Sequence, residues 1–450
     1  MVNLFQYAAP VFILCILIEV AFNAIARKPF YRLNDSLNNL SMSIADQIVA
    51  AFLKSAVFAG YMYLYEYHRL TAIPMESVAA WIACFLLVDM QYYWAHRASH
   101  EVSFLWGSHV PHHQSEEFNL SVALRQGAFQ GAFFWVFYLP IALLGFPPVM
   151  FLICLQSDVI YQFFIHTRAI GKLGPLEWFM NTPSHHRVHH GKNPKYIDKN
   201  HAGVLIIWDR MFGSFVEEEE EPLYGTATPL RSWNPVWGQI EYWVDLCKLV
   251  AQVPSWRDKA LLFLMPPAWR PAGFEKKGPP AHTTQAFYER YDAKASPPLT
   301  AYALAHFVPL VLGAVAFLSL ESDLSLGTKA FVCLAFAWSL LSIGGIMEAR
   351  RWSYWLEMSR LVGAVLGLLL LSVLGLISPI LAVALGALIA GSLAFLKAHR
   401  TGLNRAPGGL PICQDTVRLV ERARRPEMPE ANDQFQATPT ATPANMPVYK

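Results

Sequence analysis

The chain has 450 residues, of which 54% are hydrophobic and only 15% are charged, and its formal net charge at pH 7 is +2. This composition is too apolar for a water-soluble protein of this length and indicates a membrane protein. A charge so close to zero gives no sign of nucleic-acid binding. The six cysteines lie far apart, mostly in apolar runs, which indicates small core residues rather than a disulfide framework.

Nine apolar runs are long enough, or nearly long enough, to cross a bilayer, so we predict an all-α, multi-pass transmembrane helical bundle of about nine spans. The first run has no basic leader and no small-residue cleavage site, which indicates an uncleaved helix. The fourth and fifth runs are joined only by Gly145–Pro148, so we expect a tight hairpin that need not cross completely. The runs cover residues 5–25, 46–65, 77–95, 127–145, 148–165, 300–320, 329–347, 358–376 and 378–396.

Lysine and arginine are distributed unevenly between the connecting segments. With the N-terminus outside, the first inner loop carries Arg27, Lys28 and Arg32, whereas the outer loops hold little more than Arg69 and Lys329. Cytoplasmic loops are enriched in these residues, so we predict an outer N-terminus and an inner C-terminus. The histidine-rich segments then form a cap on the cytoplasmic side.

Eleven of the fifteen histidines lie between His96 and His201, in an HxxxH, an HxxHH and an HHxxHH motif with His166 between the last two. Residues three or four apart share one face of a helix, and neutral imidazole is a common metal ligand. Nine well-spaced histidines are more than one ion can use, which predicts two metal ions. These candidate ligands are His96, His100, His109, His112, His113, His166, His186, His189 and His190.

Two other interpretations of the histidines are less favoured. Scattered surface or core histidines would not form three clusters at helical spacing. A metal transporter or storage protein would need polar groups along its spans, whereas these clusters fall at the ends of spans. There is no CxxC partner, which argues against a structural zinc site.

Imidazole suits iron, copper, zinc and nickel, so the ligands alone do not choose the metal. Neutral ligands around two cations beside a membrane suit oxygen chemistry on a lipid. Iron fits best, because zinc has no redox chemistry.

Ligating histidines usually donate their second ring N–H to a carboxylate or a carbonyl. We expect Glu101, which follows a candidate ligand, to be the first such acceptor. Asp158 and Asp89 lie inside apolar runs, so both are expected near the metals or their histidines. Glu117 is expected on the surface. The full set of candidate acids is Asp89, Glu101, Glu116, Glu117, Asp158 and Asp198.

The chain is expected to divide into N-terminal transmembrane helices (1–76), a catalytic core (77–230), an interfacial segment (231–299), C-terminal transmembrane helices (300–400) and a disordered tail (401–450). Within the third part, Pro235–Val253 predicts an amphipathic, tryptophan-rich helix. It could lie in the headgroup layer or pack on the core, and the pattern does not decide. The acidic run Glu217–Glu221 is expected to be a solvated turn.

The three histidine motifs, in this order among membrane spans, resemble the fatty acid hydroxylase/sterol desaturase superfamily of membrane di-iron oxygenases. Within it, the chain is similar to the alkylglycerol monooxygenase family. One position departs from that family, because His201 stands where a tyrosine is usual. It could add a ligand or merely replace the tyrosine. The runs that carry the likeness are His96–Glu101, His112–Ser121, Ala123–Gln126, Gly174–Trp178, Asn181–Gly191, Ile197–Asn200 and Trp208–Gly213.

The resemblance implies two iron ions, dioxygen and tetrahydrobiopterin, with pterin recycling left to a separate system. It implies hydroxylation of the carbon next to the ether oxygen of a 1-O-alkylglycerol, giving a fatty aldehyde and glycerol. The family's metal ligands fall on the nine histidines, and its acid after the first motif falls on Glu101. We expect Glu101, Asp158 and Asp198 to serve catalysis. The alternative is a sterol or fatty-acyl desaturase or hydroxylase of the superfamily, fed by a protein electron donor. The membrane would be a bacterial inner membrane or the endoplasmic reticulum.

Overall fold

The computed structural model describes residues 4–274 and 290–404, and these are almost entirely helix and connecting loop. Between residues of these two ranges, the β-type pairs are two isolated bridges, Met180 with Leu205 and Gly191 with Tyr224. The prediction of an all-α fold is therefore confirmed. The predicted disordered tail lies, from residue 405 onward, outside the described residues.

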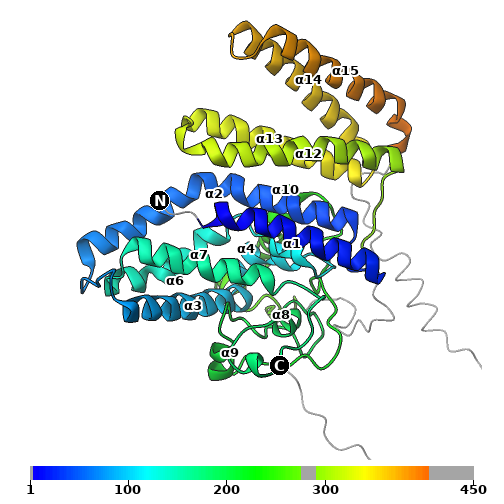
Figure 1. The fold of residues 1–450 in the computed structure, drawn as a ribbon. Helices are drawn as coiled ribbons and strands as arrows, with labels where there is room; N and C mark the ends of the chain where they lie inside the picture. Colours follow the sequence, from blue (N-terminus) through cyan, green and yellow to red (C-terminus); the bar gives the residue numbers. More distant parts are fainter. Residues whose placement is uncertain (1–3, 275–289, 405–450) are drawn as a thin grey trace, which may run out of the picture. The chain divides into compact units, whose positions relative to one another are not determined.

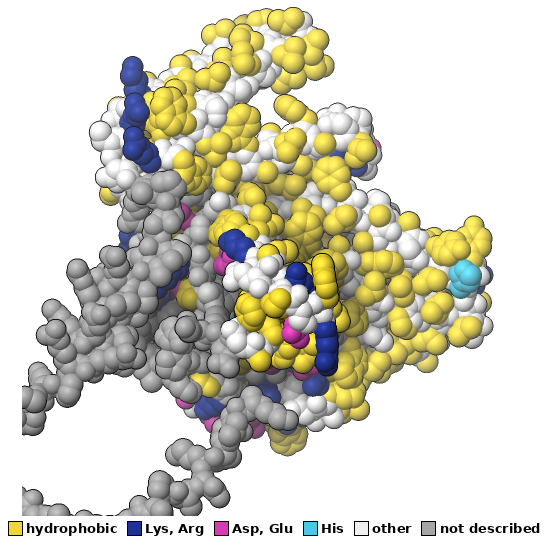
Figure 2. Space-filling view, turned by 180° about the vertical axis from the view of Figure 1, so that it is seen from behind, with side chains coloured by type: hydrophobic (Ala, Val, Ile, Leu, Met, Phe, Trp, Pro, Cys, Tyr) yellow, Lys and Arg dark blue, Asp and Glu magenta, His cyan; other side chains and the backbone are white. Residues whose placement is uncertain are grey.

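Among the described residues, seven helices are long and apolar enough to cross a membrane. Two further apolar helices, α6 (Gln130–Leu144) and α7 (Pro148–Phe164), are shorter than the roughly 20 residues of a full span. Hydrophobic side chains cover much of the face seen in Figure 2, as expected for a surface against lipid. The seven long helices are α1 (Phe5–Ala26), α2 (Leu33–His68), α3 (Val78–Glu101), α12 (Pro297–Leu320), α13 (Leu326–Met347), α14 (Arg351–Val373) and α15 (Pro379–Ala398).

The expected hairpin between α6 and α7 turns at Gly145. This residue has a left-handed backbone (φ +94°), and a Cβ there would lie 2.0 Å from the carbonyl oxygen of Thr71. Only glycine meets both conditions without strain. The turn is also bound to the loop after α2, because the Leu70 amide donates to the Leu143 carbonyl (2.7 Å).

The second helix is much longer than its apolar run, because it begins at Leu33 rather than near residue 46. Its polar first half is buried against the histidine segments. Asn39 donates to Ser121 Oγ (3.0 Å), and Asn38 donates to the Trp233 carbonyl (2.8 Å). Since these polar side chains find partners inside the protein, the helix continues where the hydropathy falls.

Shorter helices carry or adjoin the histidine motifs, and two of them, α8 and α9, lie in the lower part of Figure 1. Helix α3 contacts α4, α6, α7 and α9, and α4 also contacts α10 and α11. The short helices are α4 (Ser103–His113), α5 (Leu120–Ala123), α8 (Pro183–His189), α9 (Ile207–Phe212), α10 (Pro235–Gln252) and α11 (Trp256–Leu264), with 3₁₀ turns at η1 (Gly174–Trp178), η3 (Glu321–Asp323) and η4 (Arg400–Gly402).

The tryptophan-rich helix α10 packs against α2, α4 and α13, as one of its two interpretations expects. Its Trp243 indole donates to the Phe104 carbonyl (2.9 Å) and lies over Gly107, where a Cβ would come within 2.2 Å of the ring nitrogen. Gly238 likewise leaves space for Met42 and Gln114. The helix therefore supports α4, which carries the HxxHH motif.

Three of the four C-terminal helices are joined by one buried carboxylate, Glu357 of α14. It accepts hydrogen bonds from Tyr302 of α12 (2.5 Å), Ser342 of α13 (2.6 Å) and Arg360 (2.6 and 2.7 Å). His306 of α12 contacts both Arg360 and Ser392 of α15. A satisfied polar cluster of this kind fixes the register of helices that apolar contacts alone would leave free to slide.

Candidate metal centre

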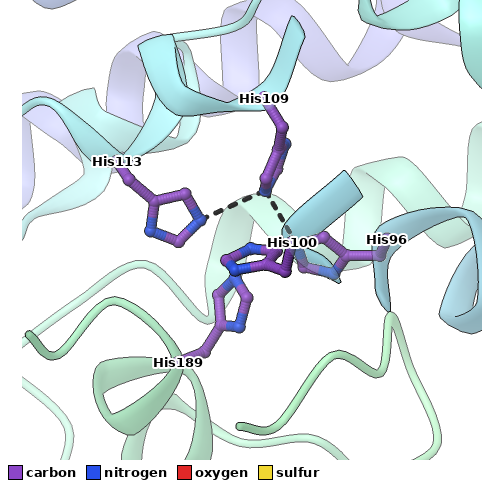
Figure 3. Close-up of side chains that lie close together, drawn as sticks. All are labelled: His96, His100, His109, His113 and His189. Carbon is purple, nitrogen blue, oxygen red and sulfur yellow. Dashed lines mark hydrogen bonds between the residues drawn. The ribbon is translucent and has the colours of Figure 1, made fainter. Parts of the chain in front are cut away.

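The structure gathers the nine candidate histidines into two buried groups, and in each group one ligand-type atom per residue lies within 4.8 Å of all the others. In the first group, His109 lies between His96 and His113 (Figure 3). The first group is His96, His100, His109, His113 and His189, and the second is His112, His166, His186 and His190.

Helical spacing explains how the groups form. The pairs 96/100, 109/113 and 186/190 are each four residues apart, and both members of each pair fall in the same group. His112 and His189 each lie three residues after the first member of such a pair and join the opposite group. The HxxHH and HHxxHH motifs therefore each serve both groups, and the two groups lie next to each other.

The Nδ1 atoms of five of these histidines point outward to oxygen acceptors. His96 donates to the His201 carbonyl (2.7 Å), and His189 to the Lys199 carbonyl (2.9 Å). His109 donates to Gln130 Oε1 (2.8 Å). In the second group, His112 donates to the carbonyl of Arg125 and His166 to that of Gln162, both at 2.7 Å. Because Nδ1 carries the proton in each ring, Nε2 offers its lone pair toward the centre of its group.

The inward Nε2 atoms approach one another more closely than uncompensated lone pairs should. The distance is 2.9 Å between His96 and His109. In the second group it is 3.2 Å between His112 and His166. Two nitrogens bound at right angles to one divalent cation, each about 2.1 Å away, would lie about 3 Å apart. The spacing therefore fits a cation held between them.

Other ring nitrogens are buried without a partner, among them Nε2 of His100, His189 and His190, and both ring nitrogens of His201 are in the same condition. Burial lowers the pKa of His112 to about 4 and that of His189 to about 3, so both rings are neutral at physiological pH. An unpaired polar atom in the interior costs about 1–3 kcal/mol. Neutral, orphaned, converging nitrogens are the donor set that a divalent transition metal would satisfy.

The loop after the third histidine motif supplies two of the outer acceptors, and two buried aspartates hold this loop. Asp89 of α3 accepts from the Val204 amide (2.7 Å) and the Leu205 amide (3.0 Å). Asp209 of α9 accepts from the amides of His201 and Ala202, both at 2.8 Å. The two aspartates thus fix the carbonyls that orient His96 and His189.

Asp158 lies beside the same loop rather than on a histidine. It accepts a weak bond from Gln162 (3.2 Å), and a Cβ added to Gly203 would lie 2.5 Å from it and 3.0 Å from Asp89. Both carboxylates are fully buried, and both face the loop at Gly203. Gly203 is needed because nothing larger fits between them and the loop.

The structure places Glu101 differently from our expectation. Its side chain is exposed and pairs with Arg97 (2.9 Å), four residues earlier on α3. The carboxylate that faces a candidate ligand is instead Asp198, whose Oδ1 lies 3.4 Å from His100 Nδ1. Burial raises the pKa of Asp198 to about 6, with a further contribution from the charge of Glu101.

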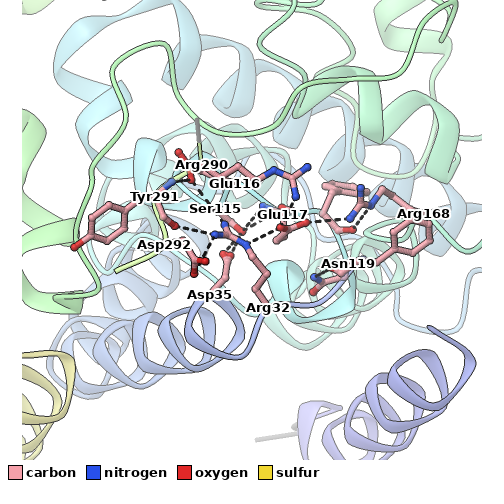
Figure 4. A network of polar contacts seen from close by, with 12 residues as sticks. Arg32, Asp35, Ser115, Glu116, Glu117, Asn119, Arg168, Arg290, Tyr291 and Asp292 are labelled. Carbon is pink, nitrogen blue, oxygen red and sulfur yellow. Dashed lines mark hydrogen bonds and ion pairs between the residues drawn. The ribbon is translucent and has the colours of Figure 1, made fainter. Parts of the chain in front are cut away.

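The expectation that Glu117 lies on the surface was wrong, since the residue is only 1% exposed. Arg32, Arg168 and Arg290 donate to its carboxylate at 2.7, 3.0 and 2.8 Å (Figure 4). Glu116 beside it accepts from the Tyr291 amide (2.6 Å). The segment after the HxxHH motif is therefore fixed by charge on several sides.

Arg125 is a buried cation behind the second histidine group. Its guanidinium donates to the Pro111 carbonyl, to Asn39 of α2 (3.1 Å) and to Gln114 (2.9 Å). Burial lowers the pKa of Arg125 to about 10, so it remains charged. The Arg125 carbonyl accepts the hydrogen bond from His112 Nδ1, so this one residue links α2, α4 and the second group.

The acidic run is not simply a solvated turn. Glu218 accepts two parallel bonds from Arg187 (2.7 and 2.6 Å), and Arg187 lies inside the HHxxHH motif. The same guanidinium donates to the Thr167 carbonyl (3.0 Å) and the Ile170 carbonyl (2.7 Å). The run thus anchors α8 to the segment that follows His166.

Two histidines of doubtful role, His185 and His201, belong to neither group. His201 contributes through its carbonyl, as described above, and its ring lies 5.0 Å from that of His100. The sequence analysis missed Gln130 and the carbonyl acceptors. It also missed Trp106, whose ring lies 4.8 Å from His100 and 5.4 Å from His113.

Comparison with known proteins agrees with this geometry. The fatty acid hydroxylase family model matches residues 81–214. The chain is 39% identical over 360 residues to an alkylglycerol monooxygenase from Xenopus tropicalis, covering 79% of this chain and 80% of the relative. It is 37% identical to one from Danio rerio, covering 83% of each chain. A relative of the same name from Homo sapiens is 45% identical over 236 residues, covering 52% of this chain and 53% of the relative. No solved structure matches.

Proposed function

The chain belongs to the alkylglycerol monooxygenase family, and on that premise we propose that it cleaves the ether bond of 1-O-alkylglycerols with dioxygen and tetrahydrobiopterin. That it is a membrane-bound monooxygenase follows from the family and from the long apolar helices. The substrate, the pterin, the two metal ions and their ligands are the proposal.

The observation that carries the proposal is the pair of imidazole groups with their Nε2 atoms turned inward. One iron ion would be held by His96, His100, His109, His113 and His189, and a second by His112, His166, His186 and His190. Bound iron would supply the redox chemistry that activates dioxygen, which zinc lacks. The outer acceptors hold the rings in place, and burial of both groups excludes bulk water.

In the proposed reaction, the carbon next to the ether oxygen exchanges a C–H bond for a C–OH bond. One oxygen atom of O₂ enters the lipid. The other leaves as water, with two electrons and two protons from tetrahydrobiopterin. The resulting hemiacetal then breaks its bond to the ether oxygen, giving a fatty aldehyde and glycerol. Buried neutral histidines suit such a reaction on an alkyl chain.

Purified full-length protein in lipid nanodiscs tests this directly. We expect about two iron ions per chain, and fatty aldehyde from 1-O-alkylglycerol only when both tetrahydropterin and O₂ are present. His100→Ala should lose iron and activity, whereas His68→Ala, on an exposed residue at the end of α2, should keep both. Iron-loaded protein that never turns over alkylglycerol would refute the substrate assignment.

The same preparation separates the second candidate function. A sterol or fatty-acyl desaturase or hydroxylase of the superfamily would accept electrons from a cytochrome or ferredoxin and ignore the pterin. We also propose that the metal centre faces the cytoplasm, in a bacterial inner membrane or the endoplasmic reticulum, because the inner segments carry most of the lysine and arginine. Labelling of Lys195 by an impermeant reagent from the outer side would contradict that orientation.

A further inference from the structure

Large apolar side chains are exposed on one side of the segment that carries the third histidine motif. Trp178 is 72% exposed and Met211 is 66% exposed. We call this group of side chains the rim. It comprises Leu173, Leu176, Trp178, Phe179, Met211 and Phe212, all of them exposed.

The rim lies alongside a membrane-spanning helix, not beyond its end. Asp89 is halfway along α3, and it accepts the Val204 and Leu205 amides and the Trp208 indole N–H (2.8 Å). The loop before α9 and the start of α9 are therefore held at the middle of α3. Since α3 is long and apolar enough to cross a bilayer, these residues lie at a depth where lipid surrounds the helix.

The other end of α9 stays beside the same helix. The Phe212 ring lies 4.7 Å from that of Trp94 and 5.4 Å from that of Tyr93, both on α3. Arg97 donates to the Phe212 carbonyl (3.2 Å). Helix α9 thus follows α3 from Asp89 to Arg97, and Figure 1 shows the two side by side.

The two halves of the rim are joined to each other. The Ile206 amide donates to the Phe179 carbonyl (3.0 Å), and Arg210 donates to the Glu177 carbonyl (3.1 Å). The rim therefore forms one continuous surface. Helix α7 is bound to the same segment, because Tyr161 donates to the Asn181 carbonyl (2.5 Å).

The charges around the rim suit a bilayer boundary. Lys172 and Arg210 are exposed cations at its margin, where Lys172 pairs with Glu217 (3.8 Å) and the Arg210 guanidinium lies over the Phe215 ring. Tryptophan flanked by such cations is typical of the membrane interface. The charged side of the same segment is different, since Lys195 and Glu219 form an exposed ion pair there (3.0 Å).

We propose that the rim is embedded in one leaflet of the bilayer, with Trp178 and Met211 in contact with phospholipid acyl chains. The segment that carries the third histidine motif is then partly sunk into the membrane instead of resting in water above it. Acyl chains would lie against α9, whose Asp209 fixes the loop that orients His96 and His189. The embedding of the rim does not depend on the proposed reaction.

Site-directed spin labelling of the full chain in phosphatidylcholine liposomes tests the proposal. Labels would be placed through Trp178→Cys and Met211→Cys, with Lys195→Cys and Glu219→Cys as matched controls on the charged side. The background would carry Cys247→Ser and Cys413→Ser. Collisions with O₂ should exceed those with a water-soluble nickel complex at 178 and 211, and the reverse should hold at 195 and 219.

Nickel-dominated collisions at 178 and 211 would overturn the proposal, because they would place the rim in water. Shielding from both collision partners would also overturn it, because another part of the chain would then cover the rim. A second measurement avoids labels altogether. Brominated phospholipids should quench the fluorescence of the unsubstituted chain more than that of Trp178→Phe, and equal quenching would count against the rim.

Discussion

Gly203 offers the sharpest test of how the protein holds its histidines. The residue lies between the loop after the third motif and two buried carboxylates. A methyl group added there would lie 2.5 Å from Asp158 Oδ1, 2.8 Å from Asp158 Oδ2 and 3.0 Å from Asp89 Oδ1. Ordinary contacts are close to 3.5 Å, so Gly203→Ala requires a shift of roughly 1 Å.

Both carboxylates are fully buried, so neither can turn away into solvent. Asp89 is held by the Val204 amide, the Leu205 amide and the Trp208 indole, so the loop must move instead. That loop carries the His201 carbonyl, which receives His96. Overpacking of this kind costs about 1–3 kcal/mol of stability. Displacing an outer acceptor weakens metal binding roughly 10- to 100-fold.

The assay is iron content per chain after dialysis against a graded chelator, together with the midpoint of thermal unfolding. Gly171→Ala is the matched control, since a Cβ there meets nothing within 4 Å. Adding Asp158→Ala to Gly203→Ala makes room for the methyl group. The fall in iron content and in unfolding midpoint should therefore be smaller in the double variant than the sum of the two falls in the single variants. Equal iron retention in Gly203→Ala and Gly171→Ala would refute the reasoning.

Three further results are expected. Acidification from pH 6.5 to 4 should release metal and destabilise the metal-free protein by about 1.4 kcal/mol per pH unit for each buried histidine. The reason is that these histidines bind protons in the unfolded chain over this range, whereas a buried ring such as His112, with its pKa lowered to about 4, stays neutral in the folded protein. An unfolding midpoint that does not change over this range would contradict the prediction. Gln130→Leu removes the acceptor of His109 and should weaken iron binding roughly 10-fold, whereas Gln130→Glu should retain it. Arg187→Lys cannot reproduce the two parallel bonds to Glu218 and should lower the free energy of unfolding by about 1–3 kcal/mol, measured by denaturant titration.

The sequence alone selects the histidines because helical spacing fixes the direction of side chains. Residues 96 and 100, or 109 and 113, must point the same way on a helix, whatever surrounds them. The division into two groups follows the same rule, with His112 and His189 crossing over. No comparable rule gave the acceptors. The carbonyls of Lys199, His201 and Arg125 have no side-chain signature, and their use depends on the path of the loops.

Two misplacements have different physical causes. Glu101 is next to His100 in sequence, but successive residues on a helix point about 100° apart. The Glu101 side chain therefore points away from the histidines and pairs with Arg97 instead. The start of α2 was placed too late because a polar stretch lowers the hydropathy. Its asparagines are nonetheless inside the protein, bonded to distant segments that the sequence does not reveal.

The burial of Arg125 has a consequence for how the enzyme could be made or trimmed. Its guanidinium depends on Asn39 from the beginning of α2, more than eighty positions earlier, and its carbonyl supports His112. A fragment starting after the second span would remove Asn38 and Asn39 and leave this buried cation with the Pro111 carbonyl and Gln114 only. Helix α2 therefore has to be in place when the segment with Arg125 folds. The N-terminal helices act as a template for assembly rather than as a detachable anchor.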